Sequence, residues 1–115
     1  MANLFRCGSM PIVFEKLHLG LAIWNTASYT STLFSEVKIR TNGFTNLNIG
    51  KITFASGKTY PYGIRGYDAS GNATVIATNP TANTDYDISQ YNSIEFFVSV
   101  VTEQPDVTLE NVVIS

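Results

Sequence analysis

Asp85 and Asp87 form the closest pair of carboxylates in the sequence, with one residue between them. Residues two apart in an extended chain point to the same side, so the two carboxylates would lie next to each other. Two carboxylates are the minimum for glycoside hydrolysis, and with backbone carbonyls they could also hold calcium. The run 84–88 lies between predicted strands and lacks EF-hand spacing. The sequence therefore favours a turn-forming role over a small hydrolase, and no metal is expected.

Cys7 and His18 are the only residues of their kinds. A single cysteine excludes an intramolecular disulfide and the CxxC pairs of zinc and thioredoxin sites. A Cys–His pair can activate a thiolate, but nothing in the sequence brings these two together. His18 lies in an alternating segment, which predicts a solvent-facing strand residue. Because the chain also lacks a phosphate-binding glycine loop, a GxSxG elbow and an HExxH motif, we expect no enzymatic activity and no cofactor.

Aromatic residues supply the remaining recognition chemistry. Tyrosine and tryptophan combine a flat apolar face with a polar end, which suits stacking on sugar rings or contact with a protein partner. Two of them flank a predicted loop, and three lie near glycines. The predicted ligand-binding residues, for a glycan or a partner, are Trp24, Tyr60, Tyr62, Tyr86 and Tyr91.

The sequence pattern predicts that strands position these side chains. Apolar residues alternate with polar or small ones, and Gly, Asn, Asp and Pro separate the alternating segments. Asn42-Gly43 is a strong turn signal, and Asp68–Asn72 predicts the tip of a hairpin. Pro61 predicts an edge strand or a strand that starts after it. The predicted strands cover residues 16–23, 36–40, 47–54, 60–67, 73–78, 93–101 and 107–114.

Two strands change their inside–outside alternation part-way along. The change falls at Gly50-Lys51 in one strand and at Asn111 in the other, and each predicts a bulge or a small break. In the strand 93–101, Phe97 and Val101 lie on the parity opposite to Ile94 and Phe96. That strand is therefore predicted to be covered on both faces or to contact a partner.

The size and composition predict one all-β domain over residues 1–115. With 115 residues, 44% of them apolar and 14% charged, the chain can fill one core. No helical periodicity is present, and two packed antiparallel sheets are the economical way to bury about eight half-apolar strands. The predicted fold is an antiparallel β-sandwich that resembles a jelly roll.

Charge argues against a nucleic-acid partner. The net charge of −2 provides no basic footprint for displacing counterions. All seven basic residues lie at or before Arg65, whereas seven of the nine acidic residues follow it. Either strands from the two halves interleave and pair opposite charges, which the sequence favours, or opposite patches promote head-to-tail assembly.

The N-terminal segment has neither the apolar run of a secretory signal nor any stretch near the roughly 20 residues that span a bilayer. We therefore expect a protein made in the cytoplasm without a signal peptide, with no membrane partner.

Three segments carry a family resemblance. They are MANLFRCG at 1–8, IRGYDASGN at 64–72 and DISQYNSIEF at 87–96. The first resembles the start of small virion proteins of phages that infect Firmicutes. The others are similar to β-sandwich modules of phage tail, baseplate, fibre and capsid-accessory proteins and to carbohydrate-binding jelly rolls.

The resemblance implies a non-catalytic virion protein that forms homo-oligomers, docks on other virion proteins and can bind host-surface glycans. A free-standing carbohydrate-binding module is the alternative, and a small glycoside hydrolase is the second alternative.

Overall fold

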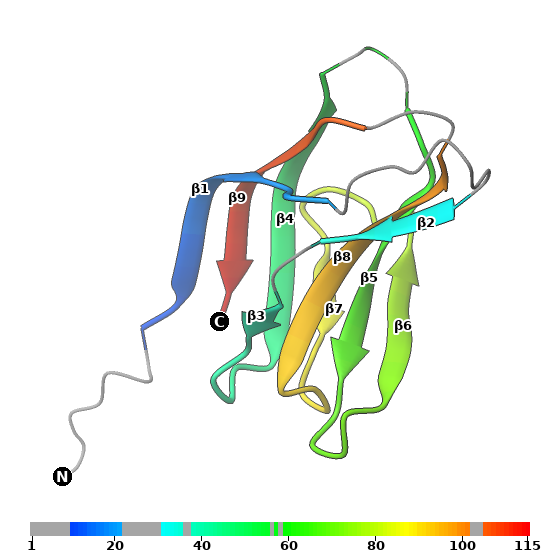
Figure 1. The fold of residues 1–115 in the computed structure, drawn as a ribbon. Coiled ribbons are helices and arrows are strands. Elements are labelled where there is room, and N and C mark those ends of the chain that lie inside the picture. The colour runs from blue at the N-terminus through cyan, green and yellow to red at the C-terminus, as the bar shows by residue number, and fades with distance from the viewer. Residues whose placement is uncertain (1–9, 22–30, 36–37, 56, 58, 102–104) are drawn as a thin grey trace, which may run out of the picture.

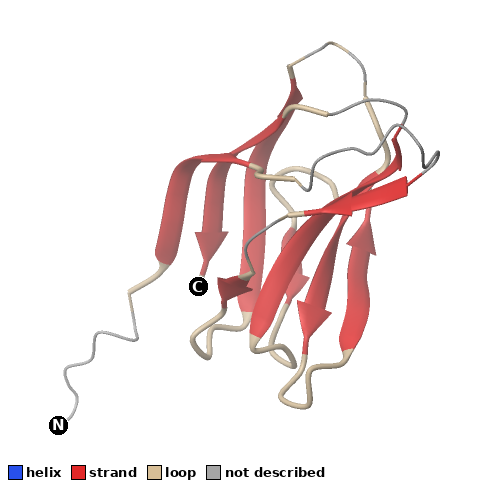
Figure 2. Ribbon diagram, in the orientation of Figure 1, coloured by secondary structure: helices blue, strands red, loops and turns tan. Residues whose placement is uncertain are grey.

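The protein is an all-β structure (Figure 1). The computed structural model describes residues 10–21, 31–35, 38–55, 57, 59–101 and 105–115. These residues form strands and loops and contain no helix (Figure 2). The strands are β1 (Ile12–His18), β2 (Ser31–Phe34), β3 (Ile39–Arg40), β4 (Asn46–Phe54), β5 (Tyr62–Tyr67), β6 (Ala73–Thr78), β7 (Asp85–Asp87), β8 (Ser93–Val101) and β9 (Val107–Ile114).

The strands form two antiparallel sheets that face each other (Figure 1). The first sheet has the order β1-β9-β4-β7, and the second has β2-β8-β5-β6 with β3 also paired to β8. Phe34 of β2 stands opposite Phe97, and Ile39 of β3 stands opposite Ile94. Because β2 and β3 pair with successive parts of β8, they act as one interrupted strand. Counted in this way, the described residues form a sandwich of two four-stranded sheets.

The order in which the chain visits the sheets is that of a jelly roll. β1 lies in the first sheet, β2 and β3 in the second, β4 in the first, β5 and β6 in the second, β7 in the first, β8 in the second and β9 in the first. This winding places the last strand, β9, between β1 and β4. The predicted jelly-roll-like β-sandwich is confirmed.

The core lies between the sheets and follows the predicted alternation. The inward residues of β4, β5, β8 and β9 are buried, as the sequence predicted for Ile94 and Phe96 of β8. Each such side chain stabilises the fold by about 1.5–3 kcal/mol through removal of apolar surface from water. The largest fully buried side chains are Phe96, Leu47, Ile49, Ile64, Ile88, Ile94, Leu109, Ile114, Val98, Val107 and Val112.

The predicted changes of alternation are real and lie in one row across three strands. Asn111 has a φ of 54°, in the left-handed region. The pairing register is constant on both sides of this row, from Leu47 opposite Ile114 to Phe54 opposite Val107. The same change occurs in β1, where Glu15 and Lys16 are both exposed. The strands therefore kink together, rather than one strand bulging against a regular partner.

The first predicted strand is the main correction. The alternation over 16–23 predicts one strand, but β1 covers Ile12–His18. The Leu19 N–H still donates to the Val107 carbonyl of β9, and the chain then leaves the first sheet, because Leu21 already bridges Ser35 next to β2 in the second sheet. Leu19 and Leu21 are buried as predicted, whereas the predicted residues 22–23 and 36–37 lie outside the described residues.

The predicted turns are confirmed. Asn42 and Gly43 both have positive φ, and the Phe44 N–H donates to the Thr41 carbonyl across the turn. The Asp68 side chain accepts hydrogen bonds from the backbone of Ser70 and Asn72 at the tip of the β5–β6 hairpin. β5 lies between β8 and β6, so it is not an edge strand. It starts immediately after Pro61, which was the other prediction for this proline.

Candidate functional site

Two of the predicted binding residues contact the core: Tyr62 is buried in it, and Tyr60 packs against it. The Tyr62 side chain is 5% exposed and points between the sheets, and the Tyr60 ring packs against Phe54 with 6.1 Å between ring centroids. Both hydroxyls are buried without a hydrogen-bond partner. Burial raises the pKa of Tyr62, and the nearby Tyr86 hydroxyl adds to the increase. A ring buried as deeply as Tyr62 offers no face to a ligand, so this residue belongs to the core.

Tyr86 and Tyr91 keep part of their rings at the surface. The Tyr86 hydroxyl accepts a hydrogen bond from the Thr81 N–H at 2.7 Å, which fixes the ring beside the loop that precedes β7. The Tyr91 ring lies over Gly66, where an added Cβ would come within 2.4 Å of the ring. Tyr86 lies in the strand β7, whereas Tyr91 lies in the loop between β7 and β8. Trp24 lies outside the described residues.

The turn predicted at Asp85 and Asp87 is wrong in part, because both residues lie in the short strand β7, which pairs with β4. The Asp85 carboxylate accepts hydrogen bonds from the side-chain amides of Asn48 and Asn46, which lower its pKa. Asp87 accepts the Ser89 N–H at the end of β7, and its interactions with Ser89 lower its pKa as well. A glycosidase needs one carboxyl that stays protonated, which requires a raised pKa. The environment of this pair shifts both residues in the opposite direction.

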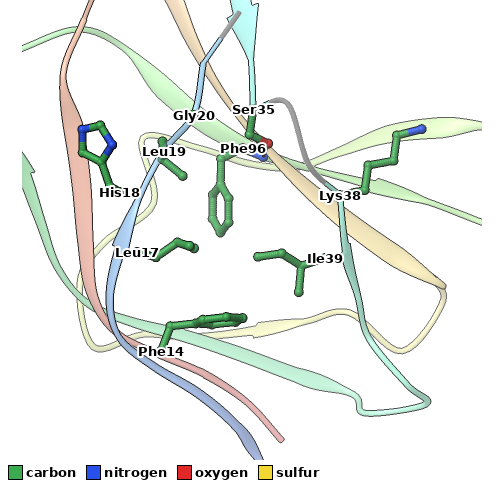
Figure 3. Close-up of a pocket in the computed structure, with 9 residues that line it drawn as sticks. All are labelled: Phe14, Leu17, His18, Leu19, Gly20, Ser35, Lys38, Ile39 and Phe96. Atoms are coloured by element: carbon green, nitrogen blue, oxygen red, sulfur yellow. Dashed lines mark hydrogen bonds between the residues drawn. The ribbon is translucent and has the colours of Figure 1, made fainter.

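An apolar cavity of about 430 Å³ opens between β1 and β3 at one side of the sandwich (Figure 3). Phe14, Leu17 and Leu19 line it from the first sheet, and Ile39 and Phe96 line it from the second. The volume falls in the range of sites that take small molecules or large side chains. Sequence reasoning missed this site because it did not assign residues 12–15 to a strand and so left Phe14 unplaced.

The polar residues at the rim of the cavity are engaged elsewhere. Figure 3 shows the ends of His18 and Lys38 directed away from the cavity. His18 Nε2 contacts the Asp106 carboxylate, and the Lys38 ammonium lies 3.8 Å from the centre of the Tyr67 ring. His18 is exposed, as predicted. The cavity is therefore suited to apolar groups rather than to acid–base chemistry.

A buried ion pair occupies the outer face of the second sheet. Glu95 is 6% exposed and accepts hydrogen bonds from the Arg65 guanidinium and the Tyr67 hydroxyl through the same oxygen, Oε1. The guanidinium also stacks 3.9 Å from the centre of the Phe34 ring. Phe97, on the outward parity of β8, packs against Phe34 and is 8% exposed. Arg65 and Phe34 thus cover the outer side of β8 at Phe97. Of the two predicted alternatives for this strand, cover on both faces or contact with a partner, the structure shows the first at Phe97.

Charges from the two halves of the chain interleave within the sheets. Glu110 of β9 stands opposite Lys16 of β1 on one side and opposite Lys51 of β4 on the other. Arg65 and Glu95 stand opposite each other in the second sheet. Where these residues are concerned, the favoured interpretation of the uneven charge distribution is confirmed.

No family model, curated protein or solved structure matches the chain. Among the described residues, no three His, Cys, Asp or Glu side chains are grouped so that they could hold a metal ion. The same residues include no helix of the length and apolarity needed to cross a membrane.

Proposed function

We propose that this protein is a non-catalytic structural module of a phage virion that acts by docking on other virion proteins. The observation that carries the proposal is the jelly-roll winding, which viral capsid and lectin domains share. Fold alone does not determine function, so the likeness of residues 1–8 to small virion proteins is the second support. The open apolar side between β1 and β3 supplies a surface suited to docking.

The proposal is tested by mass spectrometry of phage particles purified from a host that produces this protein. We expect peptides of the chain in the purified particles at a fixed copy number relative to the major capsid protein. A phage-encoded cytoplasmic enzyme from the same lysate serves as the carry-over control. Absence of the chain from particles, or a level no higher than that of the control, would overturn the proposal.

Glycan binding is the second candidate, and the setting of Tyr86 and Tyr91 favours it. Both rings are half-buried and fixed by neighbours, which is the condition for a preorganised stacking surface. Binding to a glycan array, weakened by Tyr86→Ala or Tyr91→Ala and unchanged by Thr74→Ala on the exposed β6, would support it. An array without hits would remove it and leave the virion proposal in place.

A further inference from the structure

β1 is the longest strand at a sheet edge among the described residues. It has 7 residues, compared with 3 in β7 at the other edge of the same sheet and 6 in β6. β9 pairs with one side of β1, and no described strand pairs with the other. An unpaired strand edge is a template for pairing with another chain. Two of the three large apolar residues that are most exposed, Met10 and Val13, lie on or next to β1.

The inside–outside pattern of β1 is symmetric about the point between Glu15 and Lys16. From that point outwards in both directions the residues are exposed, half-buried and exposed again. The kink described above creates this symmetry, since a regular strand would put Glu15 and Lys16 on opposite faces. Two antiparallel copies of β1 aligned about this point would match inward with inward and outward with outward residues at every position.

The charges obey the same symmetry. In this register, Glu15 of one copy stands opposite Lys16 of the second copy, and the reciprocal pair forms on the other side of the axis. Phe14 stands opposite Leu17 of the second copy, and Val13 opposite His18. Opposite charges facing each other across strands stabilise pairing, and like charges destabilise it. A shift by one residue would set inward residues opposite outward ones at all positions but the central one, where Glu15 would face Glu15 or Lys16 would face Lys16, so the register is strongly specified.

We propose that two copies of this chain form a twofold symmetric dimer through antiparallel β1–β1 pairing about the Glu15–Lys16 midpoint. The first sheet of one copy, β1-β9-β4-β7, then joins the same sheet of the second copy, and the combined sheet continues across the axis. A twofold interface uses the same surface on both subunits, and the self-complementary pattern of β1 meets that requirement.

The apolar cavity lies on the side that this pairing covers. Phe14 and Leu17 line the cavity from β1, and the second copy brings its own Leu17 and Phe14 opposite them at the cavity mouth. Pairing therefore satisfies the edge of β1 that no described strand covers and shields apolar surface in one step. One strand contributes a small contact area, so the dimer is expected to dissociate on dilution.

The experiment exchanges the two charges and measures association by sedimentation across protein concentrations. In Glu15→Lys or Lys16→Glu, like charges oppose each other at both reciprocal sites, and the dissociation constant should rise about tenfold or more. The double variant Glu15→Lys/Lys16→Glu restores opposite charges in the same register, so dimerisation should return. Both residues are exposed, so the fold should tolerate these changes, but Lys16→Glu also sets like charges opposite each other at Glu110 within the monomer. Urea denaturation of each variant therefore accompanies the sedimentation runs and checks that the monomer is still folded. Thr74→Lys, on the β6 edge of the other sheet, is the matched control and should associate like the unchanged protein.

Three results would overturn the dimer. One is a monomer at concentrations up to about 1 mM, which would mean that Glu15 and Lys16 protect the edge from pairing. The second is association that neither single reversal weakens, which would place the interface elsewhere. The third is a double variant as weak as the single ones. The dimer does not depend on the virion assignment, so a monomeric protein found in particles would refute the dimer alone.

Discussion

Gly50 and Asn111 stand in neighbouring strands so close together that a Cβ on Gly50 would lie 2.9 Å from the Cβ of Asn111 and 3.1 Å from the Glu110 carbonyl oxygen. Asn111 also has a left-handed backbone, which Asn tolerates better than most residues. The kink across β1, β9 and β4 therefore requires a missing side chain in one strand and a permissive residue in the next.

We expect Gly50→Ala to lower the free energy of unfolding by about 1–3 kcal/mol, because the added methyl group forces backbone or Asn111 to move. Asn111→Gly removes the facing Cβ and suits the positive φ, so it should be nearly neutral alone and should offset part of the loss in the double variant. Urea denaturation of the four proteins measures this coupling. Strictly additive effects would show that the two positions do not clash.

The orphaned hydroxyl of Tyr62 predicts that its removal stabilises the protein. Tyr62→Phe should raise the free energy of unfolding by about 1 kcal/mol, because it removes a buried polar group without a partner. Tyr86→Phe is the contrasting variant and should cost about 1 kcal/mol, because it removes the hydrogen bond from Thr81. Thermal and urea unfolding would show the two opposite signs, and a destabilised Tyr62→Phe would mean that the hydroxyl has a partner.

Alkaline pH provides a second test of Tyr62. The folded-state pKa of Tyr62 lies above the ordinary value of 10.0, so its ionisation does not affect the free energy of unfolding below pH 10 and lowers it as the pH rises further. The stability of Tyr62→Phe should therefore fall less steeply above pH 10 than that of the unchanged protein. Equal slopes in denaturation series at pH 9 to 11 would contradict the raised pKa.

Acid should weaken the contact between β7 and β4. The side-chain amides of Asn48 and Asn46 lower the pKa of Asp85 in the folded protein below the ordinary value of 3.8. The ionised carboxylate therefore stabilises the fold at pH values above 3.8, and this stabilisation is lost as the pH falls through the folded-state pKa. Asp85→Ala should reduce the loss of stability between pH 4 and pH 2. Asp68→Ala, which removes a carboxylate at the β5–β6 hairpin instead of β7, is the comparison variant. Urea denaturation at several pH values measures the effect, and a loss of stability in Asp85→Ala as large as that of the unchanged protein would refute the expectation.

Removing the buried carboxylate on the outer sheet face should be costly. Glu95→Ala leaves the Arg65 guanidinium and the Tyr67 hydroxyl without their shared acceptor, and we expect a loss of about 2 kcal/mol, reduced because Arg65 is partly exposed. Tyr67→Phe removes one hydrogen bond and should cost about 1 kcal/mol. Urea denaturation separates the two values. A Glu95→Ala variant as stable as the original would show that the pair contributes nothing net.

The sequence was sufficient for features that are written in neighbouring residues. Alternation located β8 at its observed bounds and identified the buried residues of β4 and β9, and Asn42-Gly43 marked its turn. The loss of alternation at Gly50 and Asn111 was visible, but their position in one row was not, because the pairing of two strands sixty residues apart is a tertiary property.

The candidate site was harder to predict for the same reason. The cavity joins Phe14 and Leu17 of one sheet to Ile39 and Phe96 of the other, and no local pattern connects them. Tyrosine is a residue type common in binding sites, but whether Tyr62 is exposed depends on which alternate residues of β5 point to the core, and here Tyr62 is one of them. The Arg65–Glu95 pair could not be predicted either. Charged residues are rarely buried unless they are paired, and the pairing of Arg65 with Glu95 depends on how β5 aligns with β8.

The central position of β9 limits when this fold can form during synthesis. Ile12 must wait for Ile114 to leave the ribosome before the two can pair, and β4 waits for the same strand. Until then, the backbone edges of β1 and β4 that pair with β9 stay unpaired, although β4 can already pair with β7. Contacts between such distant residues also make folding slow, on the order of milliseconds to seconds. Chaperone protection during translation should therefore matter more for this chain than its small size suggests.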